Sequence, residues 1–426
     1  MHSGLKPEDV FTPRAASVNP KTYISRPDLE RALALALRLP KHIVIHGESG
    51  SGKTWLYKKV LADGGYHIEV ANMGLTPSAG TIGQVLRSTV CQELSAETEQ
   101  TWAVDGGVPG LAKLASTKKE KTSTFHDPFL EALRAVRARA RDKQACLVFD
   151  NLEQVVQHRE LVRELAGYLI LLDDERYASF EVKILLVGTS AEIRDLIAQI
   201  KTSASVANRI SEIPEVARLT QQQAATFTNT GFFDLLGCEL EEESEEYKSK
   251  LNGQISYHSD RIPLHIQELC FYIACLAQDN DWVLSESGVV EGVKQWIKSS
   301  LVADVSRVQA NLNAIATRVG RRNQVLYCLG KIHNYDFTVA SVESSIKHHF
   351  PASCSGVTLN VAQILSDLAN SEHPLIRKNP NSSSYRFIDP KYRIVVRWLL
   401  YKAGSSEEIS LRDFDSAVGL WNDEGA

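Results

Sequence analysis

The chain has 426 residues, of which 43% are hydrophobic and 23% are charged. These values are typical of globular proteins, and the length predicts two or three domains. No apolar run reaches the roughly 18 residues that a membrane-spanning helix needs, and residues 1–6 lack the apolar core of a secretory signal. The seven cysteines form no Cys-x-x-Cys pair, so we expect a reducing, cytoplasmic location.

Charge is unevenly distributed along the chain. The formal net charge is −5, yet residues 298–402 contain 14 Lys or Arg and only 6 Asp or Glu. The remainder is therefore strongly acidic, and we interpret this segregation as a difference between domains. Residues 1–20 are rich in proline and polar residues and are predicted to be an irregular N-terminal arm.

Residues 21–217 have the pattern of an α/β core. Leu29, Leu33 and Leu37 recur at i, i+4 and i+8, which predicts a helix. Apolar runs predict buried strands at 42–45, 66–70, 145–150 and 182–190, and helical patterns cover 55–61, 82–94, 128–143 and 160–172. Apolar strands that alternate with helices predict a parallel sheet covered on both faces, with ligands at the strands' carboxyl ends. Residues 95–127 lack periodicity and are either a mobile insertion or a loop for a partner.

From residue 218 onward the pattern is helical, and residues 218–300 are predicted to be an all-α lid whose first helix is capped by Thr220. In residues 301–403, helical patterns at 323–332, 339–349 and 359–369 precede a strand, a turn and a strand over 375–388. Three helices followed by a β-hairpin is the order of a winged-helix domain. Residues 404–426 are polar and are predicted to be a C-terminal tail.

The stretch Gly47-x-x-x-x-Gly52-Lys53-Thr54 follows a predicted strand and opens a predicted helix. Its glycines let backbone N–H groups surround a di- or triphosphate, because side chains on Cβ would obstruct them. Lys53 would place its charge on the β- and γ-phosphates, the Thr54 hydroxyl would ligate Mg²⁺, and the helix N-terminus would favour the same anion. We expect ATP to be bound by Gly47, Glu48, Ser49, Gly50, Ser51, Gly52, Lys53, Thr54 and Trp55.

Polar residues at the ends of later strands are candidates for the chemistry. Asp150 ends a buried strand and would complete the Mg²⁺ site through water, or else it caps the next helix. Asn151 stands where a glutamate would polarise the attacking water. Because an amide is no base, hydrolysis is expected to be slow, although Glu153 could substitute. Thr189 or Ser190 would bond the γ-phosphate or that water, or would cap the following helix.

Arg209 follows the last of these strands and its helix. An arginine there could reach the γ-phosphate bound by a neighbouring subunit and stabilise the charge that develops on it. The alternative is a surface salt bridge.

Taken together, these features resemble the AAA+ ATPases. The resemblance rests on the segment around Arg26, the Gly47–Thr54 loop, Asp150, the Thr189/Ser190 strand end, Arg209 and the helical lid. It is closest to origin-recognition-type initiator ATPases and to the signal-transducing STAND ATPases, which join such a core and lid to a winged helix. Transposition helper ATPases share the segments 188–189 and 208–209. The resemblance covers about residues 20–400 and implies ATP and Mg²⁺ as ligands.

Two departures from these families matter. Asn151 replaces their usual acid, which puts turnover in doubt. The lid segment 259–265 lacks the Gly-x-Pro or glycine–arginine pattern of the relatives, although Pro263 is still expected to pack on the adenine. Whether Arg261 or His265 senses the γ-phosphate stays open.

The winged helix bears on partners. Arg377, Lys378 and Arg386 on the hairpin, together with residues 347–349 at the end of the middle helix, would form a basic surface suited to DNA phosphates. In STAND-like proteins the same module often packs on the core as a regulator.

We therefore expect an ATP-controlled switch, a slow ATPase that oligomerises with ATP and acts on double-stranded DNA or a partner protein. The alternative is a signalling or defence ATPase whose winged helix is autoregulatory and binds no DNA. A small-molecule kinase is disfavoured, because neither an acceptor pocket nor lid arginines are visible.

Overall fold

The computed structural model describes residues 4–15, 17–90, 127–190, 193, 196, 208–313, 320–379, 382–402 and 407–413. Contacts divide the chain into two compact units. The sheet unit comprises Arg26–Gly47 and Lys53–Val216, and the helical unit comprises Met1–Ser25, Glu48–Gly52 and Ala217–Ala426. The ends of the predicted phosphate loop thus belong to the sheet unit, and its middle residues to the helical unit. Among the described residues, no helix is both long and apolar enough to cross a membrane.

The sheet unit is built on five parallel strands in the order β2-β3-β4-β1-β5. The strands are β1 (His42–His46), β2 (His67–Asn72), β3 (Ala145–Asp150), β4 (Val182–Gly188) and β5 (Ile210–Glu212). In register, Val44 of β1 lies opposite Leu186 of β4 and Glu212 of β5. The parallel α/β sheet is confirmed. The sequence did not predict β5, because its three residues, Ile-Ser-Glu, form no apolar run.

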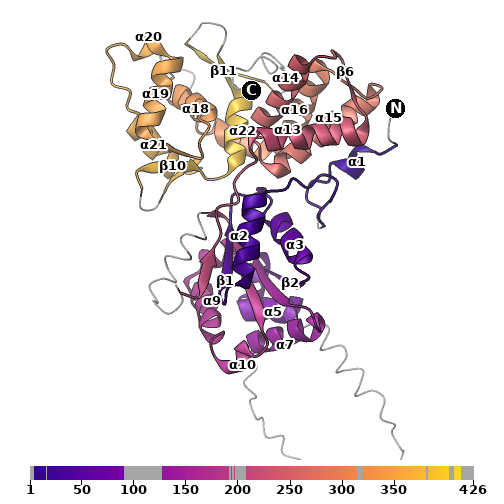
Figure 1. Ribbon diagram of the computed structural model, residues 1–426. Coiled ribbons are helices and arrows are strands. Elements are labelled where there is room, and N and C mark those ends of the chain that lie inside the picture. The colour runs from indigo at the N-terminus through magenta and orange to yellow at the C-terminus, as the bar shows by residue number, and fades with distance from the viewer. Residues whose placement is uncertain are drawn as a thin grey trace, which may run out of the picture. The chain divides into compact units, whose positions relative to one another are not determined.

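Helices cover both faces of this sheet (Figure 1). The longer ones are α2 (Pro27–Arg38), α3 (Lys53–Asp63), α5 (Ile82–Thr89), α7 (Pro128–Ala140) and α9 (Arg159–Leu171), and the short ones are η1 (Met73–Leu75), α4 (Thr76–Ala79), α8 (Glu153–Val156) and α10 (Glu175–Ala178). Side chains alternate along a strand, so Ile43 and Ile45 share a core with α2 and α3, whereas Val44 shares one with α5, α7 and α9. Because β1 runs parallel to its neighbours β4 and β5, the segment after β1 starts at the carboxyl edge of the sheet.

Two predicted helices are shorter in the structure. Helix α7, expected to reach residue 143, ends at Ala140 because Arg141 adopts a φ of 51°, in the left-handed region that a helix cannot continue. Helix α5 ends at Thr89, and the rest of its predicted span lies almost entirely outside the described residues. So does the insertion at 95–127, apart from Asp127, whose carboxylate caps α7 by accepting from two backbone N–H groups.

The helical unit begins with short helix α1 (Pro7–Val10) and contains the predicted lid. Its helices and strands are α13 (Gln221–Asn229), the π-helix η2 (Thr230–Leu236), β6 (Glu239–Leu240), α14 (Glu245–His258), α15 (Pro263–Asp279), β7 (Val283–Leu284) and α16 (Glu286–Ser300). The predicted cap is confirmed, since Thr220 Oγ1 accepts from Gln223 N at 3.1 Å. The arm is not wholly irregular as expected: Phe11 is 1% exposed and its ring centroid lies 5.1 Å from that of Phe232, so its apolar ring anchors the arm in the lid core.

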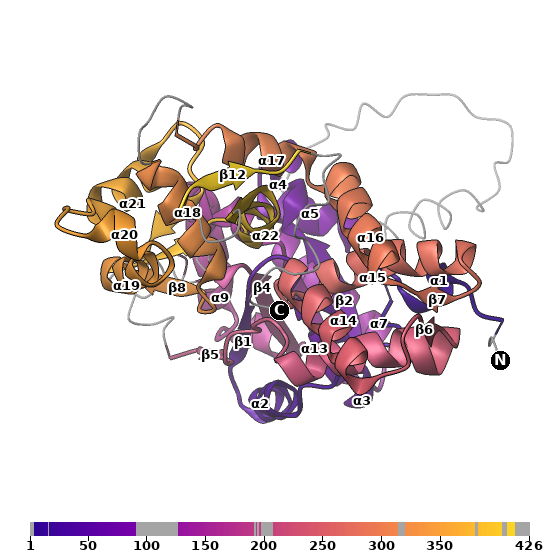
Figure 2. The ribbon, with the colours of Figure 1, turned by 90° about the horizontal axis from the view of Figure 1, so that it is seen from above.

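The winged-helix domain is confirmed in the same unit (Figure 2). It consists of α18 (Arg321–Lys331), β8 (Asp336–Thr338), α19 (Val339–His349), α20 (Pro351–Cys354), α21 (Val361–Asn370), β9 (Ile376–Lys378) and β10 (Ser384–Phe387). The three strands form an antiparallel sheet in the order β8-β10-β9. Around it lie α17 (Val302–Gln309), α22 (Pro390–Leu399), β11 (Leu400–Lys402) and β12 (Ile409–Leu411). Since β12 pairs with β11, this part of the predicted polar tail is ordered secondary structure.

Candidate nucleotide site

The phosphate loop leaves β1 at Gly47 and enters α3 at Lys53. Gly50 and Gly52 adopt φ values of +74° and +94°, which favour glycine. A Cβ added at Gly50 would also lie 2.9 Å from Leu264 Cβ, so this glycine is required by space as well as by conformation. The Lys53 ammonium donates to the Gly47 carbonyl at 2.9 Å and lies back along the loop. The loop thus has the glycine-dependent shape that a phosphate cradle needs.

Tyr57 joins the two residues predicted to hold Mg²⁺. Its hydroxyl donates to Asp150 Oδ2 at 3.1 Å and is also hydrogen-bonded to the Thr54 side chain. Burial, followed by the charge of Asp150, raises the pKa of Tyr57 far above its usual range, so the hydroxyl remains a donor. Thr54 and Asp150 therefore face one region and could share a cation there. One signal in the sequence could have pointed to Tyr57, namely its i+3 spacing from Thr54 on α3.

Asn151 has a structural task of its own. Its φ of +61° is left-handed, a conformation that asparagine tolerates better than most residues. Its backbone N–H donates to Asp150 Oδ1 at 2.9 Å, and its side-chain amide donates to Asn72 Oδ1 at 2.7 Å. The amide thus ties the ends of β2 and β3 together. Glu153, the suggested substitute base, starts α8 three residues after Asp150.

The end of β4 distinguishes its two hydroxyl residues. Ser190 Oγ donates to Glu215 Oε1 at 2.6 Å and lies 3.3 Å from His46 Nδ1, while His46 Nε2 lies 2.9 Å from Glu212 Oε1. This chain of hydrogen bonds uses the Ser190 hydroxyl within the protein. Thr189 Oγ1 is also buried, but it has no hydrogen-bond partner among the described residues. Of the pair, Thr189 therefore retains a hydroxyl that a bound group could use.

Arg209 forms the ion pair that the sequence analysis gave as its alternative role. Its Nε donates to Asp173 Oδ2 at 2.6 Å, and the Asp173 side chain is 57% exposed. Such exposed pairs contribute only about 0–1 kcal/mol. The trans-acting role of Arg209, for which it would have to leave Asp173, stays a prediction.

The lid segment contains three residues that the sequence analysis singled out, Arg261, Pro263 and His265. Pro263 occupies the first turn of α15, and the next residue, Leu264, donates its N–H to the Gly50 carbonyl at 3.2 Å. His265 is 2% exposed and lies beside Trp296, and burial lowers its pKa to about 3. His265 is thus a neutral core residue. Arg261 keeps a half-buried side chain.

The basic hairpin surface predicted for DNA needs a correction. The Arg386 side chain is only 4% exposed, because it pairs with Glu48 and Asp336. Arg377 is 23% exposed and has one nitrogen 4.0 Å from Glu48 Oε1. Lys378 and Lys347 are exposed. Most of the expected hairpin charge is therefore directed into the protein.

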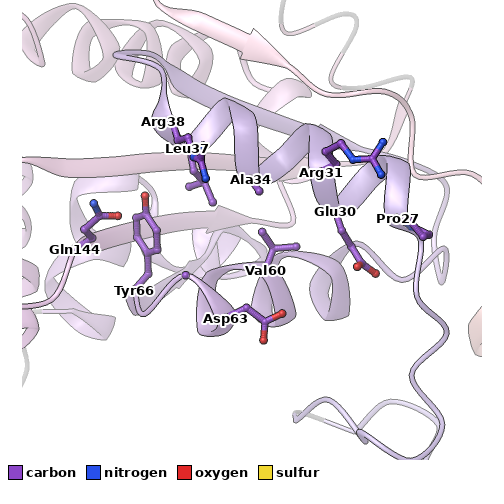
Figure 3. A pocket seen from close by; sticks show the side chains of 11 residues that line it. Pro27, Glu30, Arg31, Ala34, Leu37, Arg38, Val60, Asp63, Tyr66 and Gln144 are labelled. Carbon is purple, nitrogen blue, oxygen red and sulfur yellow. The ribbon is translucent and has the colours of Figure 1, made fainter.

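A groove of about 710 Å³ lies between α2 and α3 (Figure 3). Its lining includes Ala34, Leu37, Val60, Asp63 and Tyr66. Val60 and Asp63 belong to the C-terminal half of α3, whereas the phosphate loop joins its N-terminus. The groove is therefore separate from the loop.

A parallel sheet with a glycine-dependent loop between β1 and α3 defines a P-loop nucleotide-binding protein. Residues 37–197 match the family described as AAA domain. The Walker-type ATPase of Pyrococcus abyssi has a similar structure, with a TM-score of 0.50 and 14% identity over 90% of this chain and 99% of that one. Together with the loop, the match indicates an AAA domain at residues 37–197, in line with the predicted resemblance to AAA+ ATPases, and the similar structure shows a shared fold.

Two further similar structures have lower TM-scores. The Aeropyrum pernix ORC2 protein gives a TM-score of 0.49 and 15% identity over 91% of this chain and 97% of that one. Cdc6p from Pyrobaculum aerophilum gives 0.44 and 14% over 92% and 97%. A sequence search among curated proteins finds no match.

Replacing Lys53 by Ala should abolish tight ATP binding. Charge-assisted contacts contribute about 1.5–3 kcal/mol each, so the Kd should rise by about tenfold or more. Titration with a fluorescent ATP analogue measures this change. The matched control is Lys59→Ala, on the same helix, where the lysine pairs with Asp63 and should not matter. Equal affinities of wild type and Lys53→Ala would refute the site.

The two hydroxyls of the β4 end should respond differently to removal. Thr189→Val should leave the free energy of unfolding unchanged or slightly higher, because a buried hydroxyl without a partner becomes a methyl group, and it should slow ATP turnover. Ser190→Ala should lower the free energy of unfolding by about 1–3 kcal/mol, since His46 and Glu215 lose a partner. Denaturant unfolding and an ATPase assay test both variants. The assignment fails if Thr189→Val destabilises like Ser190→Ala and leaves turnover intact.

Proposed function

We propose that the chain is an ATP-binding switch whose winged-helix domain responds to the nucleotide at the phosphate loop. Lys53 would bind the β- and γ-phosphates, while Thr54 directly and Asp150 through water would hold Mg²⁺. Tyr57 supports this role, because its hydroxyl donates to Asp150 and accepts from the Thr54 hydroxyl, which fixes the two oxygen ligands beside each other.

One observation carries the proposed link between loop and winged helix. Glu48, the second residue of the loop, accepts from Arg386 Nη1 of β10 at 2.8 Å, and both side chains are at most 5% exposed. Breaking a buried ion pair by removing one partner costs about 3–5 kcal/mol. If the loop rearranges around a triphosphate, it must therefore either keep the Glu48–Arg386 pair or lose the free energy that this pair contributes.

Hydrolysis in this proposal is slow. Asn151 is no base, and its amide is committed to Asn72. Glu153 and Thr189 are the candidates for activating and positioning water, and Arg209 of a second copy would supply the missing positive charge. An arginine supplied in this way raises phosphoryl-transfer rates by about 10³–10⁵ in related enzymes.

The kind of partner can be inferred from the winged-helix surface that is not used in contacts within the protein. Helix α21, the third of the longer helices of the winged helix, has the sequence VAQILSDLAN and contains no lysine or arginine. With Arg386 paired internally, a regulatory winged helix that acts on a partner protein is favoured. Double-stranded DNA is the second candidate, supported by exposed Lys347 and Lys378.

Self-association supplies the test. ATP should shift the full chain from monomer towards larger species in analytical ultracentrifugation, and Arg209→Ala should bind ATP normally yet assemble less and turn over more slowly. Arg176→Ala, which removes another exposed arginine of the sheet unit, one paired with Asp174, is the matched control. A monomer at saturating ATP would contradict the proposed assembly. Labelled duplex DNA in the same runs, at low salt, would sediment with the protein only if the second candidate holds.

A further inference from the structure

The groove between α2 and α3 is open because small residues line part of it, among them Ala34 and Gly64. A Cβ added at Gly64 would lie 3.1 Å from the ring of Tyr66, so this glycine lets the ring lie close to the end of α3. The volume of the groove, about 710 Å³, lies within the range of roughly 300–1,000 Å³ that small-molecule sites occupy. A small organic molecule would therefore fit.

Three hydrogen-bond donors meet at one end of this groove. Arg38 is the last residue of α2, and Tyr66 and Gln144 directly precede β2 and β3. His67 N donates to the Gln144 carbonyl at 2.8 Å, so Tyr66 and Gln144 lie on adjacent segments of the chain. Figure 3 shows the three side chains at the same end, with the Tyr66 hydroxyl directed towards α2. Burial raises the pKa of Tyr66, which keeps its hydroxyl a donor.

These donors are not used within the described part of the chain, where no hydrogen bond or ion pair engages the three side chains. The acids of the groove have other contacts: Glu30 accepts from Arg26 N at 2.7 Å, and Asp63 pairs with Lys59. The charge of Arg38 is therefore left for a ligand. A planar guanidinium with two parallel N–H donors matches a carboxylate best.

The floor of the groove is apolar. Leu37 and Val60 line it and also belong to the core between the helices and the sheet, where they are 7% and 8% exposed. Ala34, one turn before Leu37 on α2, adds a half-buried methyl group. An apolar body lying on these three side chains would remove them from water, which is favourable. The groove thus combines an apolar floor with donors at one end.

We propose that this groove binds a small amphipathic carboxylate. Its carboxylate accepts from Arg38, Tyr66 and Gln144, and its apolar body covers the aliphatic floor. Tyr66 and Gln144 stand before the first residues of their strands, whereas the phosphate loop follows the last residue of β1. The donors therefore lie at the amino edge of the parallel sheet, and the loop lies at the carboxyl edge. The site goes beyond the proposed nucleotide switch and does not require ATP.

NMR titrations observing the ligand test the charged end of the site. The full chain is titrated with octanoate and with hydrocinnamate, and each acid is compared with its uncharged amide. Each acid should bind about 10- to 100-fold more tightly than its amide, because only the acid forms a charge-assisted contact. Arg38→Gln should bind acid and amide alike. Arg31→Gln, which removes an arginine from the other end of the groove, is the matched control and should keep the preference for the acid.

A second pair of variants tests the apolar floor. Ala34→Trp should fill the groove and abolish saturable binding of acids and amides. Ala62→Trp, at an exposed position of α3 outside the lining, should bind as wild type does. Thermal unfolding shows which variants are folded, and Arg38→Gln changes an exposed side chain, so it tests the proposal even if Ala34→Trp does not fold.

The site is independent of the nucleotide, so Lys53→Ala should bind the acids as wild type does, whatever its ATP affinity. The proposal is wrong if neither acid binds saturably to the wild type. It is also wrong if the preference for the acid persists in Arg38→Gln, or if folded Ala34→Trp still binds.

Discussion

A buried carboxylate, Asp260, is the constraint on which the helical unit depends. Burial alone would raise its pKa, but Arg393, Arg397 and Arg218 outweigh that effect and hold the pKa at about 2. The arginines in turn bind carbonyl oxygens of neighbouring segments: Arg397 Nε donates to Gly330 O at 2.7 Å, and Arg393 Nη2 to Asn334 O at 2.7 Å. One acid thus fixes the lid turn, α22 and the segment after α18 together.

A second buried ion pair, Arg386–Glu48, connects the winged helix with the phosphate loop in the same way. Arg386, whose guanidinium lies 5.3 Å from the Tyr335 ring centroid, is held between Glu48 and Asp336. Arg218 and Arg393 also lie over the Tyr335 ring. The ring therefore stands between the carboxylate of the lid and the carboxylate of the loop. Within this unit, a change of charge at the loop would be felt by groups that also hold the lid.

These long-range ion pairs explain which features of the fold and the site could be predicted from the sequence and which could not. The phosphate loop, four strands and the winged helix could be predicted because each is a contiguous pattern. The excess of basic residues in 298–402 pointed towards DNA, but the acids that neutralise part of it, Glu48 and Asp260, are distant in sequence. Pairing across more than a hundred residues leaves no local signal. Strand β5 was missed because its three residues are too short a run to show a pattern. The role of Tyr57 was missed because a single side chain on a predicted helix gives no pattern either.

Hydrogen exchange of the full chain, with and without ATP and Mg²⁺, tests most directly whether the loop and the winged helix are linked. A bound triphosphate adds negative charge at the loop, beside the Arg386–Glu48 pair. We therefore predict slower exchange in β9 and β10 at saturating ATP, and a smaller effect in Glu48→Gln. Unchanged or faster exchange in these strands, under conditions where ATP is bound, would contradict it.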